Sequence, residues 1–176
     1  MAKNSTTTVT TPAGFLSFPA LHEKSEKGKF EAGIVFTPGT DISQLEQLVE
    51  EAKNTLVPDG IPLAAVKSPL DRDGAEKAHL GGNYVEGAKF FTAKSQFKPG
   101  MVDNDVNPIL DVEEELYAGA VVRLLVHAYY FDKDGNRGIA FGLDGVQKMG
   151  AGERIGGNGI DVTQVFDKVE VEDLLA

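Results

Sequence analysis

The strongest folding signal in this 176-residue chain lies at residues 121–143, which read VVRLLVHAYYFDKDGNRGIAFGL. Side chains of residues 121–131 alternate between two faces, as expected for a β-strand with one side in a core. One face carries the apolar residues Val122, Leu124, Val126, Ala128 and Tyr130. The turn at 132–136 contains Asp-Gly, and a second apolar run follows at 138–143. Asp-Gly between two apolar runs predicts a β-hairpin.

Further strands are predicted upstream of this hairpin. Segments 14–18 and 29–36 each end at a proline, which is a strong stop signal. Segment 84–94 also has the composition of a strand, whereas residues 98–116 read as a polar loop. In the second of these strands, alternation places on one face Phe30, Ala32, Ile34 and Phe36.

One long helix is predicted over residues 42–56, with Asp41 as its cap. Apolar residues recur there at three- and four-residue spacing, as on an amphipathic helix: Ile42, Leu45, Leu48, Val49, Ala52 and Leu56. Several strands and one helix inserted between strands predict a mainly β protein. We expect a small β-barrel with long loops rather than a βαβ array.

Composition divides the chain into three parts. Residues 1–12 are polar and rich in threonine, which predicts a flexible N-terminal arm. Residues 13–150 carry the predicted barrel domain, and residues 151–176 combine a Gly-rich hinge with an acidic C-terminal tail. No apolar run is long enough for a membrane span, and the N-terminus lacks the apolar core of a signal peptide. A cytoplasmic location without membrane contact is therefore expected.

The sequence offers no convincing catalytic or metal site. It contains no cysteine, which excludes disulfides, thiolate zinc sites and cysteine nucleophiles. The three histidines lack the spacing of a zinc site, and no serine-nucleophile motif is present. Residues 103–114 imitate a calcium-binding EF-hand loop, but Pro108 stands where that loop needs glycine. We therefore expect neither an enzyme nor a cofactor.

The formal net charge of −10 argues at first against a nucleic-acid partner, because phosphate binding needs lysine and arginine. The charges are, however, unevenly distributed. Residues 161–176 carry five acidic residues and one lysine, and residues 111–115 carry four acidic residues. These two segments account for eight of the ten net negative charges. A local basic groove is therefore compatible with the overall acidity.

Basic and aromatic side chains are interleaved in residues 67–98, where the net charge is +2. Single-stranded nucleic acid is bound by this combination, because cations follow the phosphates while rings stack on bases. The same aromatic residues could equally form the core of a barrel. The candidate DNA-binding residues are the cations Lys67, Arg72, Lys89, Lys94, Lys98 and Arg123, and the aromatic residues Phe91 and Tyr129.

A set of short motifs follows one order through most of the chain. They are TPAGFLSFP at 11–19, FEAGIVF at 30–36, PLDRDG at 69–74, AKS at 93–95, PGMVD at 99–103, LYAGAVVR at 116–123, GIAFGLDGVQK at 138–148 and GERIGG at 152–157. In number and order these motifs resemble a family of single-stranded-DNA-binding proteins of tailed bacteriophages. The chain departs from that pattern at residues 104–107, where a Gly-containing turn is expected.

The resemblance implies an OB-fold barrel with a disordered acidic C-terminus. It also implies a non-catalytic protein that binds single-stranded DNA during phage replication, recombination or repair, in the cytoplasm of the infected bacterium. The tail at 161–176 would compete with DNA or recruit phage replication proteins. The alternative is a phage structural or adaptor module that binds no nucleic acid. Site size, cooperativity, oligomeric state and the choice between DNA and RNA stay open.

Overall fold

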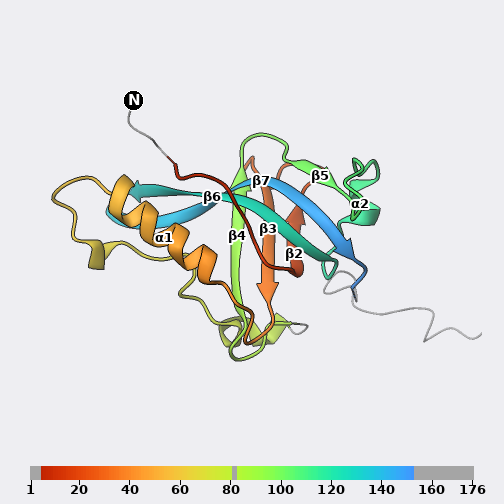
Figure 1. Cartoon of the computed structure of the whole chain (residues 1–176), viewed down its shortest axis with the longest axis horizontal. Coiled ribbons are helices and arrows are strands. Elements are labelled where there is room, and N and C mark those ends of the chain that lie inside the picture. The colour runs from red at the N-terminus through yellow and green to blue at the C-terminus, as the bar shows by residue number, and fades with distance from the viewer. Residues whose placement is uncertain (1–4, 81–82, 153–176) are drawn as a thin grey trace, which may run out of the picture.

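The computed structural model describes residues 5–80 and 83–152, most of them in strands and their connections (Figure 1). The strands are β1 (Val9–Thr10), β2 (Gly14–Ala20), β3 (Phe30–Phe36), β4 (Lys89–Ser95), β5 (Gly100–Val102), β6 (Val121–Lys133) and β7 (Asn136–Gly150). The helices are α1 (Ser43–Leu56) and α2 (Val112–Glu115), with 3-10 turns η1 (Leu63–Ala65) and η2 (Gly74–Leu80). The predicted mainly β class is confirmed. Of the hinge and tail expected at 151–176, all but the first two residues lie outside the described part.

Strands β6 and β7 form the long antiparallel hairpin that the Asp-Gly turn predicts (Figure 1). The turn consists of Asp134 and Gly135, with φ angles of 54° and 85°, between the paired residues Lys133 and Asn136. Two central residues with positive φ are typical of a type I′ turn, whose twist matches that of the flanking strands. The hairpin prediction is therefore confirmed, and β7 continues beyond the predicted strand end.

Five of the strands pair into a ring. Strand β2 pairs with β3, β3 with β4, β4 with β7, β7 with β6, and β6 again with β2. The pairs are antiparallel except β4–β7, which meet at a single parallel pair, Lys94 and Gly142. The sheet is thus partly closed into a ring, an arrangement similar to the five-stranded, partly open barrel of the OB-fold. Strands β1 and β5 lie outside it, paired with β6 and β7 respectively.

The inward-facing residues of the barrel form one apolar core. On β6 and β3, most residues that alternation placed on one face have 0% exposure: Val122, Leu124, Val126, Ala128, Ala32, Ile34 and Phe36. Phe30 and Tyr130, predicted on the same faces, are half-buried near the strand ends. The ring of Phe91 contacts those of Phe36 and Phe141, with centroid distances of 6.0 and 4.5 Å. Three aromatic rings from three strands thus fill part of the barrel interior.

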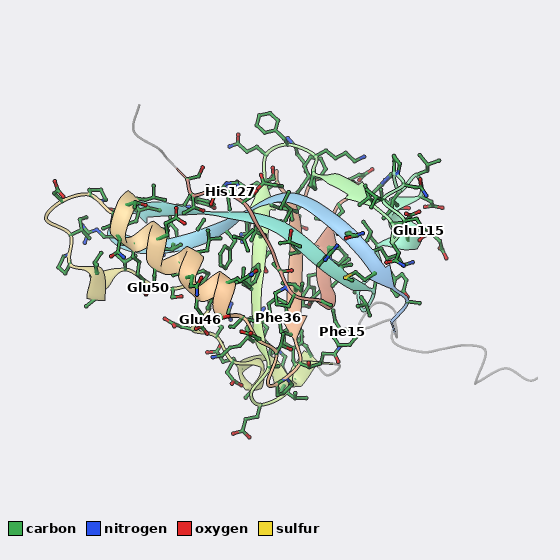
Figure 2. The ribbon with its side chains drawn as sticks, in the orientation of Figure 1. Phe15, Phe36, Glu46, Glu50, Glu115 and His127 are labelled. Carbon is green, nitrogen blue, oxygen red and sulfur yellow. The ribbon has the colours of Figure 1, made fainter. Side chains whose placement is uncertain are left out.

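Helix α1 covers part of this core with its apolar side. Its buried residues match the predicted spacing: Leu45, Leu48, Val49 and Ala52. Glu46 and Glu50 project from the helix into solvent (Figure 2). The N-cap is Ile42 rather than the predicted Asp41, whose carboxylate accepts the backbone N–H of Ser43 at 3.0 Å, a hydrogen bond that lowers the pKa of Asp41. In the part of the chain that the structure describes, no helix is long and apolar enough to cross a membrane.

The N-terminal segment differs from its prediction. The sequence predicts a flexible arm over residues 1–12, yet in the described part of this segment β1 pairs with β6. The backbone N–H groups of Leu124 and Ala128 donate to the hydroxyls of Thr11 and Thr6, each at 2.9 Å. These threonines therefore satisfy backbone groups along one edge of β6, a role that polar composition alone does not reveal.

Two other segments also differ from the sequence prediction. Strand β4 begins at Lys89 rather than at residue 84. Tyr84 belongs instead to a small apolar cluster with Val35 and Phe90, separate from the main core. The polar segment 98–116 contains the short strand β5 and the short helix α2. Short elements of this kind lack the periodicity that sequence reasoning needs.

The alternation of β6 gives a matched pair of stability variants. Leu124 has 0% exposure, whereas its neighbour Leu125 points outward and is 37% exposed. We expect Leu124→Ala to lower the free energy of unfolding by about 2–5 kcal/mol, because it leaves a cavity in the core. Leu125→Ala should cost about 1 kcal/mol or less. Urea unfolding of both variants measures the difference, and equal losses would contradict the assigned faces.

Candidate nucleic-acid interface

The outward-pointing side of β3, β4, β7 and β6 forms one surface, which we call the outer face. A row of paired residues crosses all four strands: Glu31 pairs with Lys94, Lys94 with Gly142, and Gly142 with His127. Alternation along β6 places Tyr129 on the same side as His127. Residues distant in the sequence therefore share one surface, and this surface contains both cations and rings.

The predicted cation Lys94 lies near the middle of the outer face. Its Nζ is 3.3 Å from Oε1 of Glu31, directly across the β3–β4 pair. The two side chains are 34% and 17% exposed. The Lys94 ammonium group is thus held by a largely buried carboxylate and is itself still partly exposed to solvent.

On β6 and β7, a histidine and a tyrosine lie side by side. His127 Nδ1 donates to Oδ2 of Asp144 at 2.6 Å, and Figure 2 labels the histidine where β6 and β7 run together. The His127 ring covers Gly142, where a Cβ atom would collide with the ring. The Tyr129 ring centroid is 6.2 Å from that of His127, and burial raises the pKa of Tyr129. Glycine at 142 thus allows the histidine ring to lie flat against the sheet.

The predicted cation Arg123 also belongs to the outer face. Its Nε donates to Oε1 of Gln147 at 2.7 Å. The Gln147 amide in turn donates to the backbone carbonyl of Asp103 at 3.2 Å. A neutral amide therefore orients the guanidinium group without compensating its charge.

Three other predicted cations border this surface or lie near it. Lys67 runs beside β7, and its Nζ donates to Oδ1 of Asn136 in the hairpin at 3.1 Å. The Arg72 guanidinium lies 4.6 Å from the ring centroid of Phe90. Lys98 is exposed in the turn between β4 and β5. These residues come from loops, whose positions the sequence alone did not predict.

Two predicted residues do not lie on the outer face, and for Phe91 the structure corrects the prediction. Phe91 is 4% exposed within the barrel core, so its ring cannot stack on a base. Lys89 occupies the inward register of β4, paired with the buried Phe36. Alternation from Lys94 places even-numbered residues of β4 outward. The adjacent rings of Phe90 and Phe91 look equivalent in sequence, which explains the error.

A second group of rings and cations lies on the outward side of β2, β3 and β4; sequence reasoning named its Arg72 but not Lys77 or Tyr84. Lys77 Nζ lies 5.8 Å from the ring centroid of Tyr84 and 5.0 Å from that of Phe90. The Tyr84 hydroxyl shares a 2.6 Å hydrogen bond with Oγ of Ser17. Burial, and then the nearby Arg72, lower the pKa of Lys77. We call Lys77, Arg72, Tyr84 and Phe90 the Lys77 cluster; only the basic excess of residues 67–98 signalled it.

The EF-hand-like segment 103–114 is organised by backbone hydrogen bonds. Oδ1 of Asp103 accepts the N–H groups of Asp105 and Asn107, both at 2.9 Å. Among residues 5–80 and 83–152, no group of three or more candidate ligands could hold a metal ion. The carboxylate of Asp103 therefore has a visible structural role, shaping the loop before α2.

Fold and surface together define a class: an OB-type barrel that presents cations and aromatic rings, as oligonucleotide-binding barrels do. A model of one protein family, described as the ssDNA-binding protein of Enterobacter phage Enc34, matches residues 15–175. The chain belongs to this Enc34-type family of phage ssDNA-binding proteins. The resemblance seen in the short sequence motifs is thereby confirmed.

Solved structures are similar to this chain over most of its length. The single-stranded DNA-binding protein from bacteriophage Enc34 is 16% identical, with a TM-score of 0.68 over 95% of this chain and 96% of that one. The same protein in complex with ssDNA is 17% identical, with a TM-score of 0.68 over 89% and 96%. The single-stranded DNA binding protein gp2.5 of bacteriophage T7 is 12% identical, with a TM-score of 0.64 over 94% and 98%. At these identities the likeness shows a shared fold.

A further relative is protein p50 of Acyrthosiphon pisum secondary endosymbiont phage 1. It is 30% identical to this chain over 108 residues. The matched region covers 60% of this chain and 56% of p50, so the match spans little more than half of that relative.

Proposed function

We propose that this chain is a non-catalytic single-stranded-DNA-binding protein that coats and protects DNA during phage replication, recombination or repair. Membership of the Enc34-type family supports this function. So does the fold shared with a structure described as a complex with ssDNA. The observation that carries the proposal is the outer face, where Lys94, Arg123 and Tyr129, all partly exposed, point to the same side of the sheet. We expect the protein to act in the cytoplasm of the infected bacterium.

The side chains of the outer face have complementary roles in this proposal. Lys94 and Arg123 pair with phosphates, and the rings of His127 and Tyr129 provide surfaces for bases. Each stacked base contributes about 1–3 kcal/mol, whatever its identity. Contacts to phosphates and to ring faces therefore bind any sequence, which is what a coating protein requires.

In the free protein, carboxylates on the outer face pair with the side chains that would contact DNA. Glu31 pairs with Lys94, and Asp144 pairs with His127. A phosphate that binds Lys94 must compete with the Glu31 carboxylate. Affinity on this surface therefore depends on the balance between the local acids and the incoming phosphates.

The acidic tail at residues 161–176 is a further part of the proposal. It lies outside the described residues, and its support is the sequence alone, with five acidic residues and one lysine after a Gly-rich stretch. We propose that this tail competes with DNA for the cations of the outer face or recruits basic replication proteins of the phage. Either role depends on long-range electrostatic attraction.

The proposed function predicts salt-dependent binding of a fluorescent oligo-dT. Affinity should fall as salt rises, with a slope of about 0.7 per phosphate contact. Tyr129→Leu should weaken binding about five- to 150-fold at constant salt slope, because it removes one stacking ring. Fluorescence anisotropy at two salt concentrations measures both effects, and thermal unfolding checks that the variant is folded. Absence of binding at low salt, even after deletion of residues 161–176, would overturn the proposed function.

Substitutions of Lys94 and Glu31 should change the affinity for oligo-dT in opposite directions. Lys94→Gln should weaken oligo-dT binding and reduce the salt slope by about 0.7, since one phosphate contact is lost. Glu31→Gln should tighten binding about two- to fivefold at low salt, because the competing carboxylate is gone. Lys53→Gln on α1 serves as a control and should change neither quantity. Weaker binding by Glu31→Gln would contradict competition and would mean that Glu31 orients Lys94.

Deletion of residues 161–176 tests the tail. The truncated chain should bind oligo-dT more tightly than the full chain at low salt, and the two affinities should converge as salt screens the tail. Titration of both proteins over a salt series measures this difference. An unchanged or weaker affinity after truncation would argue against competition and leave recruitment as the role of the tail.

A further inference from the structure

Phe18 is exposed and has an unusual backbone conformation. Its side chain is 63% exposed, although it lies in β2 next to the buried Leu16 and Ser17. The residue has a φ of 45°, in the left-handed region that side chains other than glycine rarely adopt. It falls where the register of β2 against β3 shifts, between Ser17 and Ala20. Strand alternation would turn Phe18 inward after Ser17, and this irregularity turns the ring into solvent instead.

This arrangement gives no evident benefit to folding. A phenylalanine with positive φ stores local strain of the order of 1–3 kcal/mol, and an exposed ring loses most of its burial energy. The neighbouring part of β2 does not require it, because Ser17 forms its own hydrogen bond to Tyr84. Strain that persists at an exposed aromatic residue is characteristic of ligand-binding positions.

Two cations lie beside this ring. Lys77 Nζ is 5.9 Å from the ring centroid of Phe18 and also faces the rings of Tyr84 and Phe90. Arg72 lies over Phe90 in the same cluster. Burial, and then the proximity of Arg72, lower the pKa of Lys77. Glu76 pairs with Arg72 at 3.1 Å, so one carboxylate stands near two cations and compensates their charge only in part. An anion bound between Lys77 and Arg72 would relieve their repulsion.

The position of Phe18 connects this cluster to the outer face. Ala20 pairs with Glu31, and Glu31 pairs with Lys94, so Phe18 lies on β2 close to the row that crosses β3, β4, β7 and β6. Neighbouring strands are about 4.8 Å apart, so the path from β2 to β6 extends for about 19 Å along the sheet. This length accommodates several nucleotides, in keeping with the site sizes of OB-folds.

We propose that Phe18, Lys77 and Arg72 form a nucleotide subsite at the β2 end of the outer face. One base of single-stranded DNA stacks on the exposed ring of Phe18, and the adjoining phosphate binds Lys77 and Arg72. The inference rests on the proposed function and extends it. It assigns a role in DNA binding to β2, through Phe18, and to η2, through Lys77, neither of which the sequence pattern identified.

The chain contains no tryptophan, which allows a direct test of stacking. Phe18→Trp introduces a single indole at the proposed subsite, and Leu110→Trp introduces one at a position that is 94% exposed and outside the cluster. We expect saturating oligo-dT to quench the indole fluorescence of Phe18→Trp strongly, because a base stacks on the ring, and to leave that of Leu110→Trp nearly unchanged. Leu110→Trp should keep wild-type affinity, and Phe18→Trp, which retains an aromatic ring, should still bind oligo-dT.

A second pair of variants tests the contribution to affinity. Phe18→Asn removes the ring but tolerates positive φ, so it should fold normally and bind oligo-dT about five- to 150-fold more weakly. Phe18→Tyr keeps a ring and should bind as the wild type does. Lys77→Gln should reduce the salt slope by about 0.7.

The outcomes separate this inference from the proposed function. If the wild type and Phe18→Trp bind labelled oligo-dT while the indole fluorescence stays unchanged, the Phe18 subsite is overturned and the proposed function stands. Wild-type affinity of Phe18→Asn would overturn the subsite in the same way. If the wild type fails to bind at low salt, with or without residues 161–176, both are overturned.

Discussion

The pairing of β6 with β7 is the interaction on which the rest of the structure depends. The other three strands of the ring, β2, β3 and β4, attach to this hairpin on both sides, because β2 pairs with β6 and β4 pairs with β7. The two strands outside the ring, β1 and β5, are attached to it as well. The hairpin depends in turn on a two-residue turn, Asp134-Gly135, whose positive φ angles match the strand twist. A shift of one residue in this register would exchange the core face of β6 with its outer face.

The same alternation separates the core from the candidate interface. Val126 and Ala128 point into the barrel, whereas His127 and Tyr129 point away from it. Two glycine positions allow close packing on the outward side: Gly142 accommodates the ring of His127, and Gly138 that of Phe131. A β-carbon at either position would displace the ring above it. The positions of the His127 and Phe131 rings on β6 therefore depend on the two glycines of β7.

Electrostatic organisation explains how an acidic protein can present a surface for DNA. Most of the net charge of −10 belongs to the tail and to residues 111–115, not to the barrel strands. On the outer face, cations are held by single partners, as Lys94 is by Glu31 and Arg123 by the neutral Gln147. In the proposed function, an incoming phosphate competes with Glu31 for Lys94, whereas Arg123 has no carboxylate among the partners seen here to displace. Overall charge is therefore a poor guide to the partner of this protein, and local charge is the relevant quantity.

The sequence by itself determined the elements with strong periodicity: the β6–β7 hairpin, strand β3, helix α1 and the faces that they bury. It also identified three candidates on the outer face: Lys94 from the basic and aromatic composition of residues 67–98, and Arg123 and Tyr129 from their shared face on the strand at 121–131. The tertiary structure alone decided which of two adjacent phenylalanines faces the main core, because both are apolar: Phe91 packs inside the barrel, whereas Phe90 packs against Tyr84 on the other side of the sheet. It alone brought Phe18 and Lys77 together and turned Phe18 outward, since these contacts join distant segments through a local irregularity of β2. Periodicity shows which face of a single helix or strand is apolar. Contacts between distant loops and strands form only when the chain folds, so they cannot be read from the periodicity of either segment.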